Sequence, residues 1–152
     1  MIDPATYLRF CDGALEHMRD MVLELGDDVA NRRPELPGAN SPFAILTHCL
    51  GMTGWWASTV NLGEVIPRDR AAEFTATGAV QPLAAQTDRL RASLIRWVGA
   101  SEPAAPPVNP PRGGDDFFAT TQGGVLFHVY EELAQHRGQL EITRDLLVAE
   151  AH

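Results

Sequence analysis

The sequence has 152 residues, 45% of them hydrophobic, so one globular domain over residues 1–152 accounts for its length. All 12 basic residues are arginine and 20 residues are acidic, and the resulting net charge of -8 excludes a basic surface for nucleic acid or anionic lipid. No apolar run approaches the roughly 18 residues of a membrane span and the N-terminus has no signal-peptide pattern, so we expect a cytoplasmic protein.

A long first helix is predicted over residues 3 to about 30. Asp3 and Pro4 supply an N-cap and a proline at the first helical position. The apolar residues then alternate in steps of three and four, as is typical of a helix that packs against other helices. They are Leu8, Cys11, Leu15, Met18, Val22, Leu25 and Val29. Cys11, like Cys49 further along the chain, is interpreted as a buried reduced thiol that serves packing.

Two more helices follow, one with a histidine at a core-facing position. The second begins at Ser41 and Pro42, and its core-facing residues are Ile45, His48, Met52 and Trp55. The third spans residues 80–99, with Leu83, Thr87, Leu90, Leu94 and Trp97 toward the core. Residues 61–79 and 102–120 are predicted to be long connections, the latter because of its five prolines.

The fourth helix is predicted from residue 121 to 148. Its leucines recur every seven residues, and a second set of core-facing residues lies between them. The leucines are Leu126, Leu133, Leu140 and Leu147, and the second set is Val129, His136 and Thr143. Four helices joined by two long connections predict an all-α four-helix bundle.

His48, Glu132 and His136 have the pattern of a metal site. Glu132 lies one turn before His136, so both side chains can reach one point, and His48 is at the matching position of another helix. A buried histidine needs partners for its ring nitrogens, and two imidazoles with one carboxylate are a recurring set of metal ligands. Alone, an inward histidine is often a hydrogen-bonded core residue, and a Glu-x-x-x-His pair often braces a helix surface. The combination favours a metal.

The last helix, with its His136-Arg137-Gly138-Gln139 run, resembles the closing helix of the DinB-like superfamily of metal-binding four-helix bundles. The stretch from Thr47-His48 to Trp55-Trp56 is similar to the superfamily's histidine helix. The resemblance implies His48, Glu132 and His136 as the metal ligands. Many members have histidine where this chain has Glu132, whereas the branch resembling mycothiol-dependent maleylpyruvate isomerases has glutamate. The resemblance therefore points to the mycothiol- or bacillithiol-dependent S-transferase and maleylpyruvate isomerase-like branch.

Six other residues have less specific patterns. His128 is interpreted as a group behind the ligands or at a pocket rim, with a plain surface histidine as the alternative. Arg137 and Gln139 could orient ligands or bind an anionic cofactor, and Arg137 could equally form an ordinary salt bridge between helices. Trp55 and Trp56 are expected to close the end of the core, and His17 to face solvent.

Three protein ligands leave a coordination position open, as in catalytic rather than structural metal sites. Zinc is the first choice of metal, with nickel and iron as alternatives. The resemblance implies a low-molecular-weight thiol as cosubstrate, and an arginine-only composition fits mycothiol. We therefore predict a metal-dependent thiol S-transferase or isomerase acting on small electrophiles. The alternative is a stress-associated bundle that binds metal or ligand without turnover.

A homodimer is also expected, because relatives often pair through bundle faces. Tyr7 and Met21 are apolar residues of the first helix that fall outside its main core-facing stripe.

Overall fold

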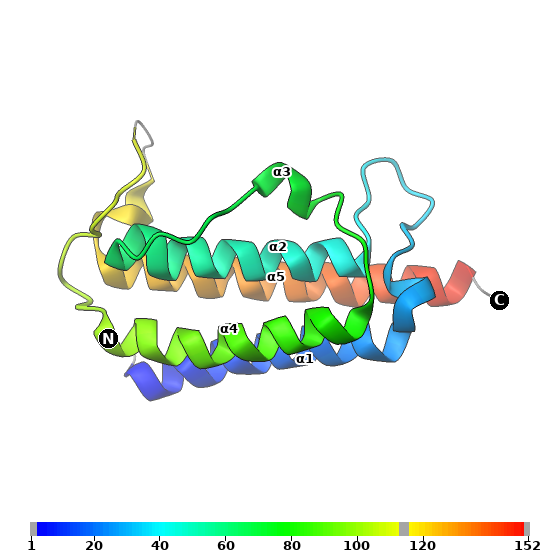
Figure 1. Ribbon diagram of the computed structural model, residues 1–152, viewed down its shortest axis with the longest axis horizontal. Coiled ribbons are helices and arrows are strands. Elements are labelled where there is room, and N and C mark those ends of the chain that lie inside the picture. The colour runs from blue at the N-terminus through cyan, green and yellow to red at the C-terminus, as the bar shows by residue number, and fades with distance from the viewer. Residues whose placement is uncertain (1–2, 113–115, 151–152) are drawn as a thin grey trace.

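The computed structural model describes residues 3–112 and 116–150, which contain helices and no strand (Figure 1). Four long helices form a bundle: α1 (Pro4–Ala30), α2 (Pro42–Gly54), α4 (Val80–Ala100) and α5 (Gln122–Glu150). A π-helix, η1 (Trp55–Val60), continues α2. The short helix α3 (Arg70–Glu73) interrupts the first long connection, and a 3-10 helix, η2 (Phe117–Thr120), ends the second. The predicted all-α four-helix bundle is confirmed.

The starts of α1 and α2 are as predicted from their caps. The Asp3 carboxylate accepts a hydrogen bond from the Thr6 backbone N–H at 2.9 Å, and Ser41 Oγ accepts one from Ala44 N–H at 3.2 Å. Each cap satisfies an N–H that has no partner within its helix. The prediction of a continuous first helix is wrong at Gly26, where a φ of 68° and a ψ of 175° interrupt the helical backbone. Only glycine adopts this conformation readily.

The core lies where the periodicity of the sequence places it. The four leucines of α5 and the middle residues of the α1 stripe are buried. The second helix differs from expectation, because it is buried on nearly every side rather than along one stripe. The reason is that the connection from residue 61 to 79, with α3, lies across its outer face (Figure 1). His48 is therefore enclosed by the core on one side and by this connection on the other.

The second connection is anchored to η1 and to the start of α5. The backbone N–H of Asn109 donates to the Val60 carbonyl at 2.9 Å, and the side chain of Gln122 bonds to the backbone at Glu102 and Pro106. Residues 113–115 of the predicted loop lie outside the described residues. Residues 102–109 of the connection are thus fastened to the bundle.

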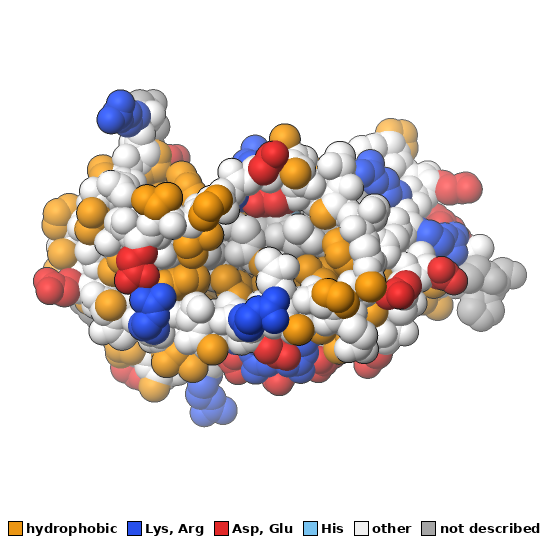
Figure 2. Space-filling view, in the orientation of Figure 1, with side chains coloured by type: hydrophobic (Ala, Val, Ile, Leu, Met, Phe, Trp, Pro, Cys, Tyr) orange, Lys and Arg blue, Asp and Glu red, His pale blue; other side chains and the backbone are white. Residues whose placement is uncertain are grey.

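Charged side chains of both signs alternate along the edge formed by α1 and α4 (Figure 2). There Arg91 pairs with Asp12 at 2.6 Å and Arg19 pairs with Asp88. Such half-exposed pairs contribute little stability individually. Within the described part of the chain, no helix is long and apolar enough to cross a membrane.

The two apolar residues outside the first helix's stripe do not support a dimer. Met21 is buried in the core, and the Tyr7 hydroxyl donates a hydrogen bond to the Leu126 carbonyl at 2.6 Å. Both side chains are thus engaged within one bundle. The homodimer stays a prediction that depends on the resemblance alone.

Candidate metal site

The bundle brings His48 of α2 together with Glu132 and His136 of α5. Each offers a ligand atom, and the three atoms lie within 4.8 Å of one another. Glu132 Oε2 is 3.4 Å from His136 Nε2 and 3.9 Å from His48 Nε2. The longer distance exceeds that of a hydrogen bond. Ligands bound at about 2.0–2.2 Å to a tetrahedral zinc ion lie roughly 3.4 Å apart, which the Glu132–His136 distance matches and the Glu132–His48 distance exceeds.

Both histidines are oriented through their Nδ1 atoms. His48 Nδ1 lies 2.8 Å from Glu73 Oε2, and His136 Nδ1 lies 2.8 Å from Gln139 Oε1. An oxygen acceptor at Nδ1 places the ring proton there and leaves the Nε2 lone pair for a metal. The predicted orienting role of Gln139 has this geometric basis.

Glu73 and its partner Arg68 are not among the site residues predicted from the sequence. The Arg68 guanidinium donates to both carboxylate oxygens of Glu73, at 2.7 and 2.9 Å. Glu73 belongs to α3, which begins at the N-cap Asp69, and it is only 6% exposed. Four helical residues in a long connection have no hydrophobic periodicity, so the sole available signal was a charged cluster beside a turn.

The surroundings favour the charge states that a metal site needs. Burial lowers the pKa of His48 and outweighs the opposing effect of the Glu73 hydrogen bond, so the neutral, metal-binding imidazole is favoured. Burial alone would raise the pKa of Glu73. The hydrogen bonds from Arg68 and His48 more than offset it, and the net pKa is lowered. Glu73 is therefore an anion facing the back of His48.

A cavity of about 460 Å³ opens beside the cluster. Its lining comes from α2, η1, α5 and the first connection: His48, Met52, Trp55, Trp56, Arg68, Arg70, His128 and Glu132. The two tryptophans were expected only to close the core. They are half-buried and also form the cavity wall, because α2 continues into a π-helix at this point. Such π segments are frequent at functional sites.

His128 lies on the cavity wall, one turn before Glu132. Its ring stacks on Phe118 at 3.8 Å and meets the edge of Trp56 at 5.1 Å. Its Nε2 is 4.0 Å from Glu132 Oε1, and it is not one of the three converging ligands. This placement agrees with the pocket interpretation rather than the surface one.

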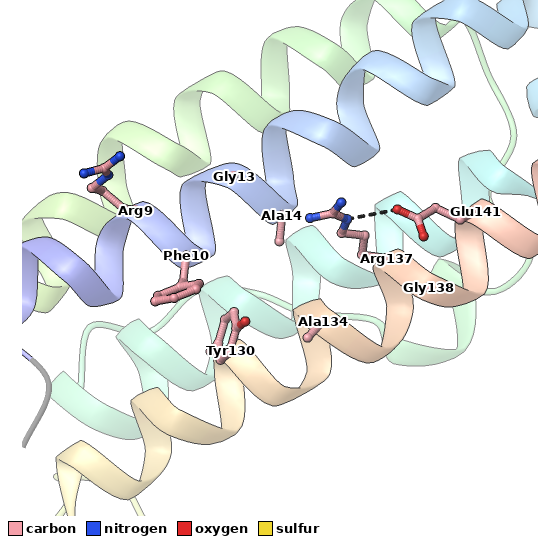
Figure 3. A pocket seen from close by; sticks show the side chains of 9 residues that line it. All are labelled: Arg9, Phe10, Gly13, Ala14, Tyr130, Ala134, Arg137, Gly138 and Glu141. Carbon is pink, nitrogen blue, oxygen red and sulfur yellow. Dashed lines mark hydrogen bonds and ion pairs between the residues drawn. The ribbon is translucent and has the colours of Figure 1, made fainter.

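Arg137 lies elsewhere. It lines a separate hollow of about 430 Å³ between α1 and α5, where it pairs with Glu141 at 3.0 Å (Figure 3). The pair lies within α5, whereas the sequence analysis considered a salt bridge between helices. His17 of α1 contacts the same Glu141 carboxylate at 3.0 Å, with 42% of its side chain exposed. Neither residue lines the cavity beside His48.

The two cysteines are free and buried, as predicted. Burial raises the pKa of the Cys11 thiol to about 11 and raises that of Cys49 as well. Neither thiol ionises near neutral pH, so neither can act as the nucleophile.

Comparison with protein families gives a match to the model described as Mycothiol-S-transferase over residues 6–149. The matched range contains His48, Glu132 and His136 and the whole cavity lining. Searches of the curated proteins and of the solved structures give no match.

Proposed function

Since the chain belongs to the mycothiol S-transferase family, within the DinB-like superfamily, we propose that it is a metal-dependent thiol S-transferase or isomerase acting on small electrophiles. The observation that carries the proposal is the convergence of His48, Glu132 and His136 beside a cavity that His48 and Glu132 line. Zinc is the proposed metal, because two imidazoles and one carboxylate with a free position are common in catalytic zinc sites. The same ligand set also suits iron(II) and nickel.

A divalent ion held by these residues would lower the pKa of a coordinated thiol, so that its thiolate is present at neutral pH. The mycothiol sulfur would form a bond to the electrophilic carbon as the thiol proton is released, and the electron pair of the broken bond would leave with the displaced group or move into the substrate. The family match assigns the thiol to mycothiol, and the chain's own two cysteines are buried away from the cavity.

The chain's own residues bind and orient the two reactants. Trp55, Trp56 and Met52 form an apolar wall against which a small electrophile can lie. His128 projects from the same wall toward Glu132 and can exchange a proton with a bound thiol. A cavity of about 460 Å³ is within the usual range for small-molecule sites.

Two measurements on one preparation test the proposal. Plasma emission analysis of protein purified without chelator should find close to one equivalent of divalent metal per chain. Mycothiol consumption with a model electrophile, such as a bimane or a chloro-dinitrobenzene, should depend on that metal and be lost in His136→Ala.

If the protein contains no metal even after incubation with zinc, nickel and iron(II), the proposed metal site is wrong. Bound metal without thiol-dependent turnover would instead support the non-catalytic binding bundle. A cytoplasmic location and a homodimer accompany the proposal as untested predictions.

A further inference from the structure

Glu73 is a buried carboxylate that does not belong to the three converging ligands. It is 6% exposed, and every hydrogen bond that it makes with other side chains goes to Arg68 or His48 within the described residues. An ionised carboxylate at such a position is costly unless it is fully paired. We propose that Glu73 is a positioning residue that controls the metal affinity of the site through His48. The inference rests on the proposed metal site.

The contacts of the His48 ring decide which of its two nitrogens faces Glu132 and His136. A neutral imidazole carries one N–H, and the other nitrogen is its acceptor or ligand atom. Glu73 Oε2, at 2.8 Å from Nδ1, holds the proton on that side, while Phe74 stacks on the ring at 4.8 Å. The ring is thus fixed with Nε2 toward Glu132 and His136. An anionic partner also makes the imidazole a stronger donor.

The Glu73 carboxylate can reach His48 only if the surface of α2 leaves room for it. Gly51 lies one turn after His48 on α2, directly under the Glu73 carboxylate. A Cβ atom at this position would lie 2.0 Å from Glu73 Oε1 and 2.8 Å from its Cδ. The backbone of α2 would accept alanine, but the carboxylate would have to move away. Gly51 therefore provides the space that lets Glu73 approach His48.

The two histidines differ in the charge of the side chain that hydrogen-bonds to Nδ1. His136 is supported by the neutral amide of Gln139, whereas His48 is supported by a carboxylate paired with Arg68. Arg68 itself lies over the Trp55 ring at 5.8 Å, within the cavity lining. The connection that carries Arg68 and Glu73 thus completes the site from outside the bundle.

The test is a set of zinc titrations against a chromophoric chelator, with four single variants and one double variant. Glu73→Ala and Gly51→Ala should each weaken Zn²⁺ binding by about 10 to 100-fold, as the loss of such supporting partners typically does. The double variant should bind zinc no more weakly than Glu73→Ala. Without the carboxylate, the nearest remaining neighbour of the new methyl group is Arg68 Nε at 3.5 Å, which is an ordinary van der Waals contact. Gly51→Ala keeps every charge, so it remains informative if Glu73→Ala folds poorly.

Two matched controls lie outside the site. Glu64→Ala removes another carboxylate of the same connection, which pairs with Arg96 at 2.9 Å. Gly99→Ala places a methyl group in open space on α4. Both should bind zinc like the parent.

A second readout, independent of metal, is the ring tautomer of His48 in long-range ¹H–¹⁵N spectra of the metal-free protein. The parent should show the Nδ1–H form, and Glu73→Ala and Gly51→Ala should lose that preference. Parent-like zinc affinity and an unchanged tautomer in both variants would overturn the inference alone. If the parent protein binds no zinc, the metal site and the dependence of zinc affinity on Glu73 are both wrong. The tautomer of His48 would still report whether Glu73 orients the ring.

Discussion

Glu132 and His128 lie one turn apart on α5 and face the same cavity, but only Glu132 is among the converging ligands. Glu132→Gln preserves shape and deletes charge, so metal affinity should fall by more than about 100-fold. His128→Ala should cost about 10-fold, and His17→Ala, far from the cavity, should cost nothing. Competition titrations with zinc measure all three. If Glu132→Gln binds like the parent while His128→Ala loses the metal, the site has three histidine ligands.

At the scale of helices, two glycines of α1 allow the effect of backbone conformation on stability to be measured without a change in packing. A Cβ atom at either position would meet open space. Gly13 is an exposed residue within the helix, so Gly13→Ala should stabilise the fold by about 0.5–1 kcal/mol. Gly26 has φ 68° and ψ 175°, so Gly26→Ala should destabilise it by about 1–3 kcal/mol. Urea denaturation measures both free energies of unfolding. Changes of the same sign would show that Gly26 does not interrupt α1.

For the whole molecule, a metal bound only by the folded chain stabilises it by mass action. Free metal at 100 times its dissociation constant adds about 2.7 kcal/mol, so chelation should lower the Tm by roughly 5–10 °C. Differential scanning calorimetry before and after chelation measures this, and the Tm of His136→Ala should not respond. An unchanged Tm in the parent, after emission analysis has verified that the metal is gone, would contradict metal binding by the folded state.

The sequence by itself determined the four long helices, the caps of the first two and most residues of the core. These features depend on local rules: Asp3 and Ser41 cap the turns that follow them, and leucines seven residues apart share one face of a helix. The same periodicity placed His48 and His136 toward the core with Glu132 one turn away, so the three proposed ligands could be selected before their convergence was seen. The family resemblance pointed to the same three residues.

Only the tertiary structure decided what surrounds those ligands. Glu73 and Arg68 belong to a connection without periodicity, and they reach His48 because that connection crosses α2 and because Gly51 leaves room for a carboxylate. Arg137 is next to His136 in the sequence, but successive helix residues differ by about 100° in direction, so it lies against α1 instead. The contacts that orient a ligand form between segments distant in the chain, where spacing along the sequence carries no information about position in space.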